Sequence, residues 1–68
     1  MGNRIQYIHN SDGKISGCLI IDTSGNKYFV DNNKQVLFYF DNADNITYDK
    51  AKNILGVGDG VAYLVSNL

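Results

Sequence analysis

The sequence contains few of the residues that most often crosslink very small proteins or take part in catalysis. Its 68 residues include one cysteine, one histidine, no proline and no tryptophan. A single thiol, Cys18, excludes an internal disulfide, so the chain lacks the pattern of a secreted disulfide scaffold. One cysteine and one histidine also cannot supply the four ligands of a zinc site. We therefore predict no metal site and no cofactor.

Long apolar runs are missing as well. Segments such as Cys18 to Ile21 are far shorter than the ~18 residues that a membrane-spanning helix needs. The first residues lack the apolar centre of a signal peptide. These absences predict a single soluble domain, residues 1–68, in the cytoplasm and away from membranes.

Glutamate is absent, and all seven acidic residues are aspartates. Aspartate and the nine asparagines favour turns and helix caps over helix interiors. Their placement between apolar runs predicts short strands joined by tight turns, with no linker and no internal repeat. The net charge of −1 argues against binding nucleic acid mainly by neutralising phosphates, but it leaves base stacking open.

The run 35–40 is the centre of the predicted sheet because it joins five consecutive β-formers without a charge. Gly17 interrupts an earlier strand and predicts a bulge or bend there. Residues 47–55 show apolar spacing typical of a helix, with Thr47 as a candidate N-cap and Gly56 as a candidate C-cap. The predicted strands are 4–9, 14–22, 27–30, 35–40 and 61–66.

These elements predict a mainly β fold, in which the second, third and fourth strands form an antiparallel meander. Curling of so small a sheet would give a five-stranded, OB-like, partly closed barrel with one short helix at about 47–55. An SH3-like barrel and a small α+β sheet are the alternatives.

Residues 13–66 also resemble a degenerate cold-shock domain, a family of the OB-fold group. The resemblance rests on Gly13-Lys14-Ile15-Ser16, Tyr28-Phe29-Val30, Val36-Leu37-Phe38-Tyr39-Phe40 and the segment 55–63. It implies a barrel that binds single-stranded nucleic acid by stacking bases on strand aromatics. The chain departs from the family where Leu37 replaces an aromatic and where strand 4–9 is added.

Catalysis is not predicted, because a nucleophile needs a base within hydrogen-bond reach. Cys18 lies in an apolar strand, where a small core residue is expected. His9 ends a strand beside a turn, where exposure to solvent is expected. The aspartates all lie in turns or beside caps, where local hydrogen bonding explains them.

The aromatic residues of the central strands are the candidate binding residues. Phe38 with Tyr28 or Val30 is expected in the core. We expect the remaining aromatics to face outward and stack bases, with lysines contacting phosphates. The predicted nucleic-acid site consists of Phe29, Tyr39, Phe40, Lys14, Lys27 and Lys34.

A protein contact is the alternative use of the same surface, since contiguous exposed aromatics mark partner sites in general. Under that interpretation the chain is a small interaction protein that binds another protein or itself. Its composition also resembles that of phage or mobile-element proteins that inhibit a host system.

Overall fold

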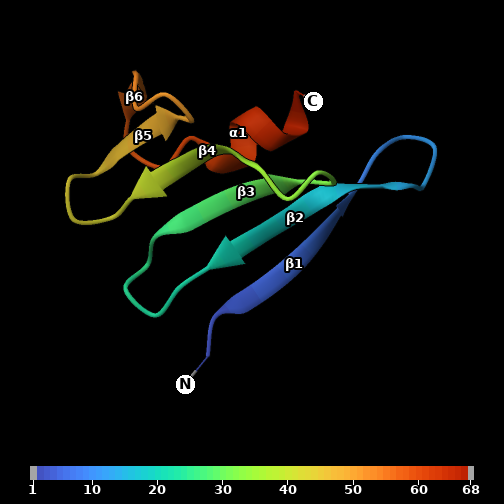
Figure 1. Cartoon of the computed structure of the whole chain (residues 1–68). Helices are drawn as coiled ribbons and strands as arrows, with labels where there is room; N and C mark the ends of the chain where they lie inside the picture. The colour runs from blue at the N-terminus through green and yellow to red at the C-terminus, as the bar shows by residue number, and fades with distance from the viewer. Residues whose placement is uncertain (1, 68) are drawn as a thin grey trace.

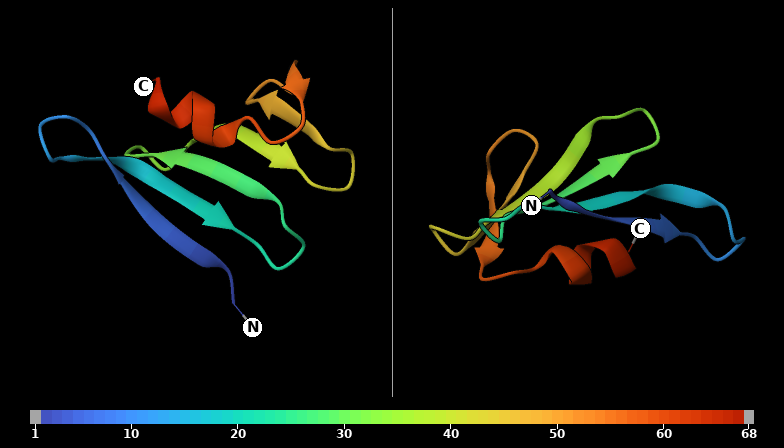
Figure 2. Two further views of the ribbon diagram at one scale, coloured as in Figure 1. Left: turned by 180° about the vertical axis from the view of Figure 1, so that it is seen from behind. Right: turned by 90° about the horizontal axis from the view of Figure 1, so that it is seen from below.

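A computed structural model describes residues 2–67, and in that range the chain forms six strands and one short helix. The strands follow one another across a single antiparallel sheet in sequence order, and α1 lies against one face (Figures 1 and 2). The elements are β1 (Arg4–His9), β2 (Ile15–Ile21), β3 (Lys27–Asp31), β4 (Val36–Asp41), β5 (Ile46–Asp49), β6 (Ile54–Val57) and α1 (Val61–Ser66).

The mainly β class and the antiparallel meander of β2, β3 and β4 are confirmed. The sheet differs from the predicted barrel in two respects: it has six strands rather than five, and it is not closed. Strands β1 and β6 are its edges, and α1 covers part of one face instead of plugging a barrel (Figure 2). No element of residues 2–67 covers the opposite face, which we call the open face.

One turn geometry recurs between the strands. In four turns an asparagine or aspartate oxygen accepts hydrogen bonds from the backbone N–H groups two and four residues later, at 2.8–3.1 Å. The residue three positions after it has a positive φ of 64° to 87°. This is a three-residue hairpin loop with a left-handed last residue. The four turns begin at Asn10, Asp22, Asp31 and Asp49.

The core lies between α1 and the middle of the sheet. Phe29 and Phe38 are opposite each other on β3 and β4, and their rings stack with centroids 5.2 Å apart. Phe40 and the fully buried Val61 complete the cluster of buried apolar side chains, with Leu64 packed against it. A helix this short is held by such packing rather than by its own propensity.

The connection from β6 to α1 is tied to the sheet by polar contacts. The buried Thr47 donates its hydroxyl to the Gly58 carbonyl at 2.7 Å and accepts the Gly60 N–H at 3.0 Å. Asp59 forms an ion pair with Lys27 of β3. Together these contacts place the start of α1 over the aromatic core.

The predicted helix at 47–55 is wrong, because these residues form β5, a turn and β6. Asp49 starts the same turn as the earlier aspartates, and Lys52 takes its left-handed position with φ 68°. Thr47 is a buried strand residue rather than a helix cap. The local turn chemistry therefore outweighs the helical spacing of the apolar residues.

The predicted strand at 61–66 is also wrong, since this segment is α1. Val61, Leu64 and Val65 recur at helical spacing and all contact the core. By pattern alone, a six-residue apolar run fits a strand or a helix equally well. Here the segment forms a helix because that helix covers the core.

Candidate binding surface

The open face of the sheet carries a continuous apolar row that crosses all six strands. Because Phe29 points to α1, its neighbour Tyr28 points to the opposite face. The strand register then places one residue of each strand directly beside the next. In order, the row is Ile5, Ile20, Tyr28, Tyr39, Tyr48 and Ile54.

Three tyrosines stack in the middle of this row. The ring centroids of Tyr28 and Tyr39 are 6.1 Å apart, and those of Tyr39 and Tyr48 are 5.2 Å apart, both with interplanar angles of 25°. Each stacked pair adds ~0.5–1.5 kcal/mol beyond burial, so the rings are held in place. Tyr39 lies between two neighbours that each cover part of one of its ring faces. It is thus poorly placed to stack a base.

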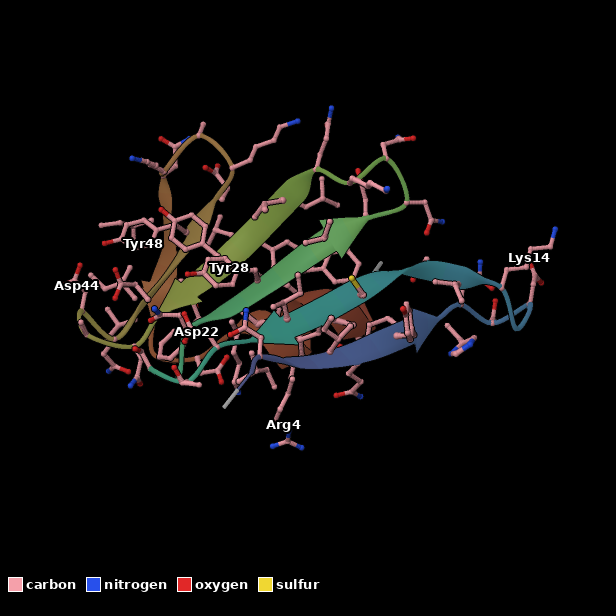
Figure 3. All side chains as sticks on the ribbon, turned by 60° about the horizontal axis from the view of Figure 1, so that its bottom comes forward. Arg4, Lys14, Asp22, Tyr28, Asp44 and Tyr48 are labelled. Atoms are coloured by element: carbon pink, nitrogen blue, oxygen red, sulfur yellow. The ribbon has the colours of Figure 1, made fainter. Side chains whose placement is uncertain are left out.

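A second row runs parallel to the first on the same face. The register joins Tyr7, Cys18, Val30 and Val36 side by side. Tyr7 is 62% exposed, and Ile54 at the end of the first row is 63% exposed. Figure 3 views this face with α1 behind the sheet. We call the two rows together the tyrosine face.

Carboxylates border the tyrosine face at one end. The Tyr48 hydroxyl donates to Asp44 at 3.5 Å, and Tyr28 hydrogen-bonds Asp22 (Figure 3). Partial burial, then the charges of Asp44 and Asp41, raise the pKa of Tyr48. Partial burial would raise the pKa of Asp22, but hydrogen bonds from Asn26, Ser24 and Tyr28 lower it overall. The Tyr48 hydroxyl therefore holds its proton more firmly, and the Asp22 carboxyl holds its proton less firmly, than each group ordinarily does.

Charge is divided between the two ends of the strands. The turns 10–14, 31–35 and 49–53 lie at one end and hold four lysines and three aspartates. The opposite end, with turns 22–26 and 41–45 and the segment 58–60, holds four aspartates. Arg4 and Lys27 are the basic residues nearest that second end. We call these the lysine end and the aspartate end, and Figure 3 shows Lys14 far from Asp22 and Asp44.

The structure does not bring the predicted nucleic-acid residues together. Phe29 and Phe40 are 1% and 4% exposed beneath α1, so the prediction that they face outward is wrong. Strand alternation shows which residues share a face, but not which face the core selects. Lys27 faces α1 and pairs with Asp59.

The remaining predicted residues lie apart from that core. Tyr39 is partly exposed on the opposite, open face, and Lys14 and Lys34 lie in turns at the lysine end. The sequence predicts Tyr28 or Val30 in the core and Tyr48 in a helix. Both Tyr28 and Val30 lie on the tyrosine face instead, so sequence reasoning did not find the tyrosine row. In three turns an aspartate is followed, after two intervening residues, by Gly or Lys. This repeated spacing was the sequence signal for the turns that set the register of the tyrosine row.

No cluster of three histidine, cysteine or acidic side chains suited to a metal ion occurs within residues 2–67. Cys18 is partly exposed on the tyrosine face rather than buried in the core as expected. His9 is exposed at the end of β1, as predicted.

Two hollows border α1. One of about 130 Å³ lies between β6 and α1 and is lined largely by apolar groups, including Leu55 and Tyr63. The other, about 590 Å³, lies by the turn after β1, where the Ser16 hydroxyl already donates to the Ile8 carbonyl. Neither hollow gathers a nucleophile with a positioned base.

Comparison with protein-family models finds no matching family, and comparisons with curated proteins and with solved structures find no similar protein. The only helix in the part of the chain that the structure describes, α1, is too short to cross a bilayer.

Proposed function

We propose that the protein is a non-enzymatic binding module that docks a protein partner on its tyrosine face. The observation that carries this proposal is the apolar row that crosses six strands with no element of residues 2–67 packed over it. Contiguous exposed apolar patches of this kind mark interaction sites on small proteins. Tyrosine is enriched at such sites because it joins a rigid apolar ring to a polar hydroxyl.

Three observations favour a protein partner over single-stranded nucleic acid. Phe29 and Phe40 are covered by α1, which removes two of the three predicted stacking residues. Tyr39 shares its ring faces with neighbouring tyrosines. The carboxylates of Asp22 and Asp44 border the row, where they would repel phosphates. Nucleic acid, which the cold-shock resemblance suggests, is the competing outcome of the test.

The test is photo-crosslinking in the cells that make the protein, with benzoylphenylalanine in place of Ile20. This position lies in the apolar row. Benzoylphenylalanine at Asn33, an exposed turn residue at the lysine end, is the matched control. We expect protease-sensitive adducts from position 20 and few from position 33, and loss of the adducts on adding Tyr39→Asp.

Nuclease-sensitive adducts from position 20 would instead assign the face to nucleic acid. In purified protein, a titration with short single-stranded nucleic acid, monitored by tyrosine fluorescence, distinguishes the same two kinds of partner. We expect no saturable quenching. Equal adducts from positions 20 and 33, or none from either, would overturn the proposed docking face.

A further inference from the structure

We infer that the partner which fits the tyrosine face is a second copy of this chain, stacked face to face with its strands antiparallel. The inference rests on the proposed function and identifies the occupant of the same surface. Two sheets pack through apolar faces about 10 Å apart, which is the arrangement of a β-sandwich. A second copy supplies a face of matching size, shape and apolar character.

Size supports this occupant. The molecule measures 34 × 29 × 18 Å, so its broad face can supply the ~800 Å² per partner of a standard interface. Only four apolar side chains are buried in the part of the chain that the structure describes, namely Phe29, Phe38, Phe40 and Val61. Chains of this length commonly gain a sufficient core by association.

Charge selects the orientation of the second copy. A two-fold axis along the apolar row keeps each strand over its own counterpart and reverses the strand direction. The lysine end of each copy then lies over the aspartate end of the other. A two-fold axis along the strands would place like ends together, and like charges brought face to face are unfavourable. The antiparallel sandwich is thus the self-complementary arrangement.

This arrangement predicts which residues of the two copies lie opposite each other. Asp44, between β4 and β5, lies over the turns that hold Lys34 and Lys52 of the second copy. Ile20 and Tyr39 lie in the row along the axis, so each faces its own counterpart. The central tyrosines would form the buried middle of the interface and the turn charges its rim, as in typical interfaces.

The first experiment is sedimentation equilibrium of the purified chain at concentrations up to about 1 mM, which reaches the range of weak association. We expect a dimer of twice the 7.5 kDa chain mass. Tyr39→Asp, or Tyr7→Asp at the already exposed second row, should give a monomer with an unchanged circular dichroism spectrum. Tyr63→Asp is the matched control, because Tyr63 is 72% exposed on α1, away from this face.

The second experiment tests orientation by thiol crosslinking. In a Cys18→Ser background, Ile20→Cys should be joined to its counterpart by a short bismaleimide, because position 20 meets itself across the axis. Under the alternative axis, Ile20 would lie over Tyr48 and no such product would form. Asp44→Lys should raise the dimer Kd about two- to fivefold, and adding Lys34→Asp should restore it.

A monomer at every concentration would overturn the inference, as would a dimer lost in Tyr63→Asp but kept in Tyr39→Asp. A dimer that gives no crosslink between the two copies of Ile20→Cys would overturn the antiparallel orientation. Failure here remains separate from failure of the proposed function. If the chain is monomeric while position 20 still crosslinks to other proteins, only the second copy is excluded as partner.

Discussion

Gly17 lies in β2 directly beside the aromatic core. A Cβ atom built at this position would lie 2.3 Å from the Val30 carbonyl oxygen and 2.7 Å from Cζ of Phe29. Both contacts are shorter than real Cβ contacts allow, and one of them is to backbone. The register shift opposite Ile8 confirms the predicted irregularity next to this glycine. The glycine is required by the Val30 carbonyl together with the Phe29 ring, and the sequence pattern could place neither of them.

Gly17→Ala should therefore destabilise the fold by about 1–3 kcal/mol, the usual cost of forcing extra atoms into a packed core. Gly56→Ala is the control, since a Cβ atom at that position would have no heavy atom within 4 Å beyond its chain neighbours. Urea unfolding of both variants measures the two free energies. Equal stability of the two variants would show that Phe29 does not cover Gly17.

Thr47 shows how one hydroxyl organises the approach to α1. Thr47→Val keeps the shape of the side chain but leaves the Gly58 carbonyl and the Gly60 N–H without their partner. Unpaired buried groups of this kind cost about 1–3 kcal/mol each. We expect a loss of that order in urea unfolding, together with faster hydrogen exchange in α1.

The comparison for that prediction is Thr23→Val, a similar change at an exposed turn position. It should alter the free energy of unfolding by less than about 0.5 kcal/mol, as surface substitutions usually do. An equal loss in both variants would mean that a general effect of replacing a hydroxyl by a methyl group, and not the loss of the two buried hydrogen bonds, sets the effect at Thr47.

At the scale of the elements, the sequence indicated the first four strands well and the last three elements poorly. Strands at 4–9, 27–30 and 35–40 are recovered because clear alternation and Asx turns bound them. The errors fall after residue 46, where β5 and β6 have four residues each and α1 has six. Elements this short span only about two periods of either pattern, and short apolar runs fit a strand or a helix equally well.

The Asx turns also predict how stability depends on pH. Hydrogen bonds from Asn26, Ser24 and Tyr28 outweigh partial burial and lower the pKa of Asp22 below 3.8. Bonds from Asn53 and Ala51 likewise lower the pKa of Asp49 below 3.8. A lowered carboxylate pKa gives stability that is complete above about pH 4 and lost as pH falls through the folded value.

The double variant Asp22→Asn with Asp49→Asn should flatten this acid loss, since the amide oxygen can still accept the turn hydrogen bonds, as Asn10 does. Urea midpoints at several pH values between neutral and about pH 3 measure the slope. Thr23→Val, at an exposed turn position that carries no titratable group, should leave the slope unchanged. An unaltered slope in the double variant would contradict this origin of the acid sensitivity.

At the scale of the whole molecule, the choice between a closed barrel and an open sheet was beyond the sequence. Every strand pairs with its neighbour in sequence, and a pattern of adjacent hairpins is common to both architectures. Closure depends on whether the first and last strands meet, and β1 and β6 are separated by the full width of the sheet. The sequence could not locate the candidate site for the same reason, because the position of α1 decides which face of the sheet stays uncovered.

The same sequential topology governs how the chain folds. Pairing of neighbouring strands keeps most contacts local, which favours rapid folding for a β protein. The sequence contains no proline, so the slow isomerisation phase of tens of seconds has no source. Refolding from urea at low protein concentration, followed by tyrosine fluorescence, should therefore be a single fast exponential.

Association of two copies would add a second phase to the refolding kinetics followed by tyrosine fluorescence. At higher concentration we expect a slower change whose rate rises in proportion to protein concentration, because docking of folded chains is bimolecular. Tyr39→Asp should remove this phase and leave the fast one, although the loss of two stacked ring contacts lowers the stability of the sheet. A slow phase that is independent of concentration would instead reveal a rearrangement within one chain, and would contradict the view that the sheet forms complete before two faces meet.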